Sequence, residues 1–113
     1  EEPVMRKILA SLMVLPLVVV LAVPTVSAFG CPKSIEKAQD AIDQAAAAMA
    51  KLPKDKQGLV HTLIDDAKMV LVSAEHNHKK PAAGNYDHAR SIAKANTAYG
   101  YALAAQKLAK SLR

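Results

Sequence analysis

Between Leu59 and Leu112, apolar residues recur every three or four positions, the spacing of helices with one buried face. In the first half of this stretch the polar residues Asp65, Asp66 and His76 lie opposite an apolar stripe formed by Val60, Ile64, Ala67, Leu71 and Ala74. Asp55 is a candidate N-cap, and Pro81 cannot continue a helix. We therefore predict a helix over 56–78 and a turn that contains Pro81.

A second long helix is predicted over 86–112, with Asn85 as its N-cap. Its apolar positions form a wide arc of two ridges, one made of Tyr86, Ala93, Ala104 and Leu108, the other of Ile92, Tyr99 and Leu103. A wide arc predicts packing against two neighbours. Gly100, in the middle of this helix, should cost about 1 kcal/mol relative to alanine. A glycine at this position would be explained either by the close approach of a neighbouring helix or by a kink.

An earlier helix is predicted over 33–52, before Pro53. Its apolar residues follow a narrow, coiled-coil-like seam: Ile35, Ala38, Ile42, Ala45, Met49 and Leu52. No stretch alternates apolar and polar residues as a strand would. The predicted fold is all-α, an antiparallel three-helix bundle that dimerisation could extend to four helices.

The N-terminal segment has the layout of a secretory signal peptide. Met5, Arg6 and Lys7 precede an apolar run from Ile8 to Val23, and small residues lead to a cleavage position after Ala28. We predict a signal peptide with an upstream extension over 1–28 and a helical domain over 29–113. A retained anchor is the alternative, although the run of roughly 16 residues is short of the ~20 that span a bilayer.

Cys31 follows Gly30 and offers a second way of processing the leader. Lipoprotein signals place a small residue directly before an acylated cysteine, whereas Val26, Ser27 and Ala28 suit ordinary cleavage. Both alternatives remain open, so Cys31 is a lipidation candidate or a free thiol. A lone cysteine forms no internal disulfide.

The charge of the chain adds little to this picture. From Phe29 onward, thirteen Lys and Arg residues face eight Asp and Glu residues, and they are spread along the helices. Solvated helix faces explain this distribution, and an exported protein is not expected to bind nucleic acid. We expect a periplasmic or outer-membrane-associated protein whose partner is an envelope protein, a second copy of the chain or, through a lipid anchor, the outer membrane.

The candidate metal ligands of the chain lie around the predicted turn. His76 and His78 end one helix, His88 opens the next, and Glu75 and Asp87 are nearby. Imidazoles with a carboxylate suit Cu, Ni or Zn. On an intact helix His76 and His78 point about 160° apart, so the predicted ligands are Glu75, His78 and His88, with His76 joining only if the helix end frays.

Ordinary structural roles are the favoured explanation for the same histidines, and His61 is expected to form a surface pair with Asp65. No nucleophile triad, phosphate-binding loop or paired-cysteine motif occurs, so we predict that the protein is not an enzyme.

The segment from Gly84 to Ala95 resembles the Gly-x-Tyr-x-x-Ala signature shared by tetratricopeptide-type hairpins and short bacterial envelope proteins. With Leu63 to Lys68 before it, the arrangement is similar to a family of alanine-rich helical envelope lipoproteins of unknown function. The chain also resembles the SmbP-type small periplasmic metal-binding proteins in its leader, size and four histidines. That resemblance implies a helical bundle that sequesters divalent metals.

Two functions follow as expectations. The first is a non-catalytic exported helical bundle that acts as a binding or structural module of the bacterial envelope. The alternative is a periplasmic protein that sequesters a divalent metal at the histidines of the turn.

Overall fold

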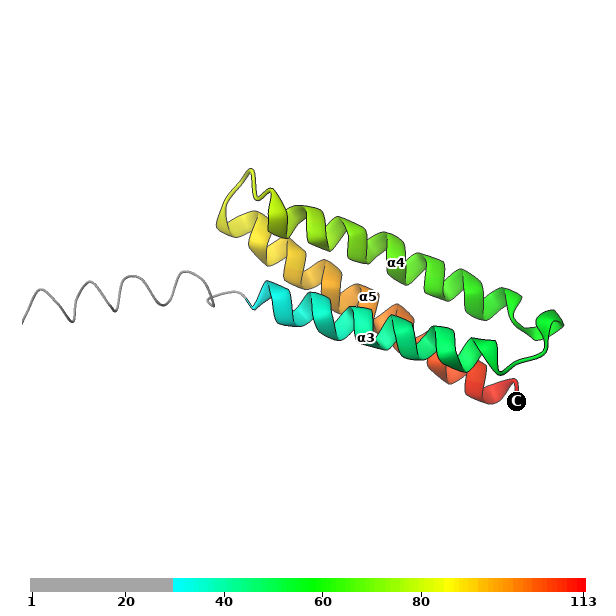
Figure 1. Cartoon of the computed structure of the whole chain (residues 1–113). Helices are drawn as coiled ribbons and strands as arrows, with labels where there is room; N and C mark the ends of the chain where they lie inside the picture. Colours follow the sequence, from blue (N-terminus) through cyan, green and yellow to red (C-terminus); the bar gives the residue numbers. More distant parts are fainter. Residues whose placement is uncertain (1–29) are drawn as a thin grey trace, which may run out of the picture.

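A computed structural model describes residues 30–113, and in this range the chain forms three long α-helices and one short 3-10 helix. Helix α3 spans Cys31–Ala50, η1 Lys54–Lys56, α4 Gly58–Lys79 and α5 Asn85–Ser111. The helices pack side by side, with α4 running antiparallel to both α3 and α5 (Figure 1). The predicted all-α three-helix bundle is confirmed. The predicted signal peptide and its cleavage after Ala28 lie outside the described residues.

The apolar stripes predicted for α3 and α4 form most of the core. In α4 all five predicted stripe residues, from Val60 to Ala74, are buried. In α3 the buried seam residues are Ala38, Ile42 and Ala45, with Ala41 beside them, while Ile35 and Met49 pack at the edge of the core. None of the three described α-helices is long and apolar enough to cross a membrane.

The buried face of α5 differs from the predicted one. The first predicted ridge is largely wrong, because Tyr86 is 65% exposed and Ala93 and Ala104 are exposed, and in the second ridge Leu103 is 42% exposed. Tyr99 and Leu108 are half-buried and pack at the edge of the core, as predicted. The core face consists instead of small residues: Ser91, Ala95, Ala98, Ala102, Ala105 and Ala109. Because α5 lies against both α3 and α4, small side chains let two helices approach it closely.

The caps of α4 and α5 also differ from the prediction. Asp55 lies within η1, and the N-cap of α4 is Gln57, whose side chain donates instead to the carbonyl of Leu52 at 2.9 Å. Asn85 is the first residue of α5, and Gly84 precedes it with φ 62° and ψ −125°. That conformation is open essentially only to glycine, so the turn depends on Gly84 rather than on an asparagine cap.

The structure excludes one of the two explanations for Gly100. Helix α5 continues without interruption through this position, and an added Cβ would meet no heavy atom within 4 Å. Gly100 therefore does not permit a close helix approach.

Candidate metal centre

The up-down-up order of the helices brings three chain segments together at one end of the bundle: the start of α3, the end of α4 and the start of α5 (Figure 1). Each segment contributes one candidate metal ligand, namely Cys31, His78 and His88. One ligand atom from each residue lies within 4.8 Å of the other two. These three residues could therefore hold a metal ion through one sulfur and two nitrogens.

Cys31 is positioned by the start of α3, two residues earlier than predicted. Gly30 adopts a left-handed conformation with φ 62°, and Pro32 favours the first helical turn. The Cys31 side chain is only 2% exposed. Its Sγ lies 3.9 Å from Nδ1 of His88 and 3.4 Å from the His88 carbonyl oxygen, to which the thiol donates. The thiol thus faces inward, toward α5.

The two imidazoles approach each other from α4 and α5. Their ring centroids are 5.8 Å apart and the ring planes make an angle of 64°. A tetrahedral zinc ion with bonds of about 2.0–2.3 Å would hold its ligand atoms roughly 3.5 Å apart. Closing the observed cluster around such an ion requires shifts of roughly 1 Å, within reach of side-chain rotation at three helix ends.

His78 supplies a second observation in favour of a bound ion. Its Nδ1 atom is buried from solvent and has no hydrogen-bond partner among residues 30–113. A buried polar atom without a partner costs about 1–3 kcal/mol, and such atoms are uncommon in folded proteins. A cation held at the cluster gives the imidazole of His78 a role that the surrounding protein groups do not.

Glu75 and His76 lie near the cluster but are not part of it. Helix α4 continues to Lys79, so the fraying that would bring His76 toward His78 does not occur, and His76 is exposed. Glu75 is half-buried and lines a hollow between α3 and α4 together with His78. Its carboxylate is not among the ligand atoms that come together. Of the four residues proposed as ligands from the sequence, the structure brings together His78 and His88.

Asp87 organises the turn that holds these histidines. Its buried carboxylate accepts a hydrogen bond from the backbone N–H of Ala83 at 2.7 Å and one from the side-chain amide of Asn77 at 3.4 Å. Arg90 lies 3.6 Å from the same carboxylate. These contacts fix the first turn of α5 relative to the last turn of α4, and with it the position of His88 relative to His78.

A polar ladder extends this connection along the hairpin. Lys94 on α5 donates to the side-chain oxygens of Ser73 at 2.7 Å and Asn77 at 2.6 Å on α4, and Ser91 donates to the carbonyl of Ala74 at 2.7 Å. Charge-assisted hydrogen bonds of this kind hold two helices in one register. The α4–α5 hairpin is therefore a rigid support for His78 and His88.

The sequence analysis did not include Cys31 among the metal ligands, because it interpreted this cysteine as a lipidation site or a free thiol. The predicted topology of the bundle could have placed Cys31 beside the histidines. In a three-helix bundle with alternating directions, the start of the first helix lies beside the turn between the second and third. His61, far from this end, pairs with Asp65 at 3.2 Å, and the predicted surface pair is confirmed.

The fold and the cluster together define a three-helix bundle with a candidate Cys-His-His metal centre at one end. Comparison of the chain with protein-family models, curated proteins and solved structures found no match.

Proposed function

We propose that the protein is an exported, non-catalytic helical bundle of the bacterial envelope that binds one transition-metal ion through Cys31, His78 and His88. The observation that carries the proposal is the convergence of these three ligand atoms within 4.8 Å, from segments up to 57 residues apart in the chain. The unpartnered Nδ1 atom of His78 supports it independently.

The donor set favours particular metals. A thiolate selects Zn²⁺ and Cu⁺, and imidazole suits Zn, Cu and Ni, whereas Mg²⁺ and Ca²⁺ prefer oxygen ligands. The histidines and a carboxylate alone suited Cu, Ni or Zn. Because the site includes the Cys31 thiolate, we expect it to prefer Zn²⁺ and Cu⁺. Three protein ligands leave a fourth position for water or for a group of a partner that receives the metal.

In this proposal Cys31 stays a free thiol rather than a lipid anchor. A thioether-linked lipid would need Sγ at the surface, whereas the Cys31 side chain is 2% exposed and faces His88. Cleavage after Ala28 is the processing that leaves this thiol available. Mass spectrometry of the N-terminus of the protein from its native envelope tests this part, and a diacylglyceryl-modified Cys31 would contradict it.

Isothermal titration of zinc into the reduced chain, prepared from Phe29 onward, tests the metal site. We expect one ion per chain, and Cys31→Ser or the His78→Ala/His88→Ala pair should weaken binding at least about tenfold, since even outer-sphere partners contribute that much. The matched control is His61→Ala/His76→Ala, which removes two exposed histidines and should leave the affinity unchanged. Wild-type binding weaker than ~100 μM, or equal affinities in all variants, would remove the metal function.

Cell fractionation tests the placement separately. We expect the chain without its leader in the periplasmic or outer-membrane fraction. The intact leader on a cytoplasmic protein would refute export while leaving the metal site to be judged by titration.

A second candidate function, a module that acts through protein contacts, is favoured by a specific surface. The three most exposed large aliphatic side chains, Leu59, Met69 and Val72, all lie on α4 and are 66–72% exposed. Met69 and Val72 lie on one face of α4, three residues apart, and contiguous exposed apolar surface is typical of contact sites. A metal-free chain that still associates with itself or with an envelope protein would favour this function.

A further inference from the structure

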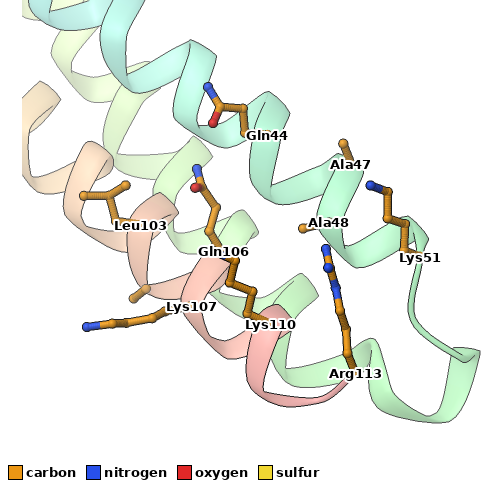
Figure 2. A pocket seen from close by; sticks show the side chains of 10 residues that line it. Gln44, Ala47, Ala48, Lys51, Leu103, Gln106, Lys107, Lys110 and Arg113 are labelled. Carbon is orange, nitrogen blue, oxygen red and sulfur yellow. The ribbon is translucent and has the colours of Figure 1, made fainter.

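A shallow groove runs between α3 and α5, on the side of the bundle away from the metal centre (Figure 2). Its volume is about 790 Å³, and its floor is made of small or apolar side chains, Ala47 and Ala48 from α3 and Leu103 and Ala104 from α5. A smaller hollow continues the groove toward the start of α3 and shares Gln44, Leu103 and Gln106 with it. This hollow is also lined by the charged residues Lys33, Glu36, Lys37 and Asp40, so the apolar floor belongs to the larger groove.

The groove is strongly cationic at the end where α3 and α5 stop. Lys51, Lys107, Lys110 and Arg113 line it, and no acidic side chain does. None of the four has an ion-pair or hydrogen-bond partner within the described part of the chain. Figure 2 shows Arg113 extending from the end of α5 toward Ala48 on α3, across the mouth of the groove. The groove therefore suits an occupant that is apolar along its length and acidic at one end.

The outer face of α4 has these properties. Met69 and Val72 are 68% and 66% exposed, and Asp65 lies on the same face one turn before Met69. Asp66, which is half-buried, adds a second carboxylate next to it in the chain, so on this face the acidic positions come before Met69 and Val72 along α4. This face packs against none of the other described helices.

We propose that α4 of a second copy of this chain docks in the groove between α3 and α5, running antiparallel to both. In this direction Asp65 and Asp66 of the incoming α4 lie toward the end of the groove that holds Lys51, Lys107, Lys110 and Arg113. Met69 and Val72 then lie over the floor toward Leu103 and Gln44. The second copy completes a four-helix arrangement with alternating helix directions, the usual packing of small bundles.

Helix dipoles favour the same direction. The C-terminal ends of α3 and α5 carry partial negative charge, which is one reason that cations collect there. The N-terminal half of an antiparallel α4 brings the opposite partial charge to that end, together with two carboxylates that pair with the four cations.

The interface is heterologous, because one copy contributes its groove and the other its α4. Both copies then point the same way, and the groove of the second copy remains open for a third. Association of this kind extends to short chains of copies rather than stopping at a symmetric dimer. It is independent of the metal centre, which lies at the other end of the helices.

Sedimentation velocity of the chain from Phe29 onward tests the proposal. We expect an average mass that rises above one chain with protein concentration and falls as salt screens the charges. A groove variant, Lys107→Glu/Lys110→Glu, and a face variant, Asp65→Lys/Met69→Lys, should each remain monomeric. All four positions are exposed, so circular dichroism should show unchanged helicity in both variants.

Mixing the two variants gives the decisive result. The face variant retains its groove and the groove variant retains its α4, so an equimolar mixture should form a dimer that grows no further. The matched control, Lys79→Glu/Lys80→Glu, reverses two exposed lysines at the other end and should associate like the wild type. A wild-type chain that stays monomeric at millimolar concentration, a control that dissociates equally, or a mixture that stays monomeric would overturn the proposal.

Discussion

At the scale of single residues, the candidate site depends on a few buried polar groups that hold helix ends in place. Cys31 and His88 are in contact because Gly30 and Pro32 start α3 and because Asp87 fixes the start of α5. Asp87 has no ligand role in this arrangement. Its carboxylate satisfies donors from the turn and from α4, and so connects the two helices.

Asp87→Ala should destabilise the fold by about 1–3 kcal/mol, because it leaves the amide of the buried Asn77 and the N–H of Ala83 without their acceptor. Chemical denaturation measures the loss. Asp40→Ala, an exposed position on α3, is the control and should change stability by less than about 0.5 kcal/mol. Equal effects of the two substitutions would show that the Asp87 contacts do not support the turn.

Two glycines of the hairpin, Gly84 and Gly100, should respond to alanine in opposite directions. Gly100→Ala should stabilise the protein by about 0.5–1 kcal/mol, because α5 is helical there and the added methyl meets open space. Gly84→Ala should destabilise it by about 1–3 kcal/mol, because φ is 62° and ψ is −125°. Thermal unfolding of both variants measures the difference, and a loss of stability in Gly100→Ala would mean that this glycine has a packing role.

At the scale of helices, the alanine face of α5 defines the bundle. Ala98 is fully buried, whereas Ala104 on the same helix is exposed. Ala98→Leu should destabilise the fold by about 1–3 kcal/mol, because the larger side chain pushes apart helices that pack on methyl groups. Ala104→Leu adds the same volume at the surface and should leave stability nearly unchanged. If denaturation finds Ala98→Leu as stable as the wild type, α5 does not pack closely against its neighbours.

How well the sequence predicted each helix depended on which residues face the core. In α4 the buried positions include Val60, Ile64 and Leu71, whose size makes the helical period plain, and the stripe was predicted correctly. In α5 the large residues such as Tyr86 and Leu103 lie at the surface, and alanines occupy the core. Alanine is both a strong helix former and a weak hydrophobic signal, so its periodicity does not show which face is buried.

The same distinction applies to the candidate site. His78 and His88 lie on either side of a turn that Pro81 and Gly84 make visible in the sequence, so their proximity could be predicted. Cys31 is 57 residues from His88, and its contact with that histidine depends on how α3 packs against the hairpin. The Cys31 thiol could therefore be recognised as a candidate ligand only from the tertiary structure.

At the scale of the whole molecule, a bound ion would connect all three helices at one end. Zinc at about 100 times its dissociation constant should add about 2.7 kcal/mol to the free energy of unfolding and raise Tm by roughly 10–20 °C. A chelator should reverse the shift, and the His78→Ala/His88→Ala variant should show none. A zinc-induced shift of the same size in that variant would place the ion elsewhere.

Acid should reduce this stabilisation. Only neutral imidazole and thiolate bind the metal, so protons compete with it and the shift in Tm should shrink from about pH 7.5 to about pH 5.5, where histidines generally become protonated. Thermal melts with and without zinc at each pH measure the effect. A shift that is independent of pH would show that imidazoles are not the ligands.

X-ray absorption of the zinc-loaded, reduced chain at the zinc edge tests the central claim most directly. The Cys-His-His centre predicts one sulfur at about 2.3 Å and nitrogen or oxygen neighbours, including two imidazoles, at about 2.0–2.1 Å. The sulfur should disappear in Cys31→Ser. A coordination shell without sulfur in the wild-type protein would contradict the assignment of Cys31 and of the site that it completes.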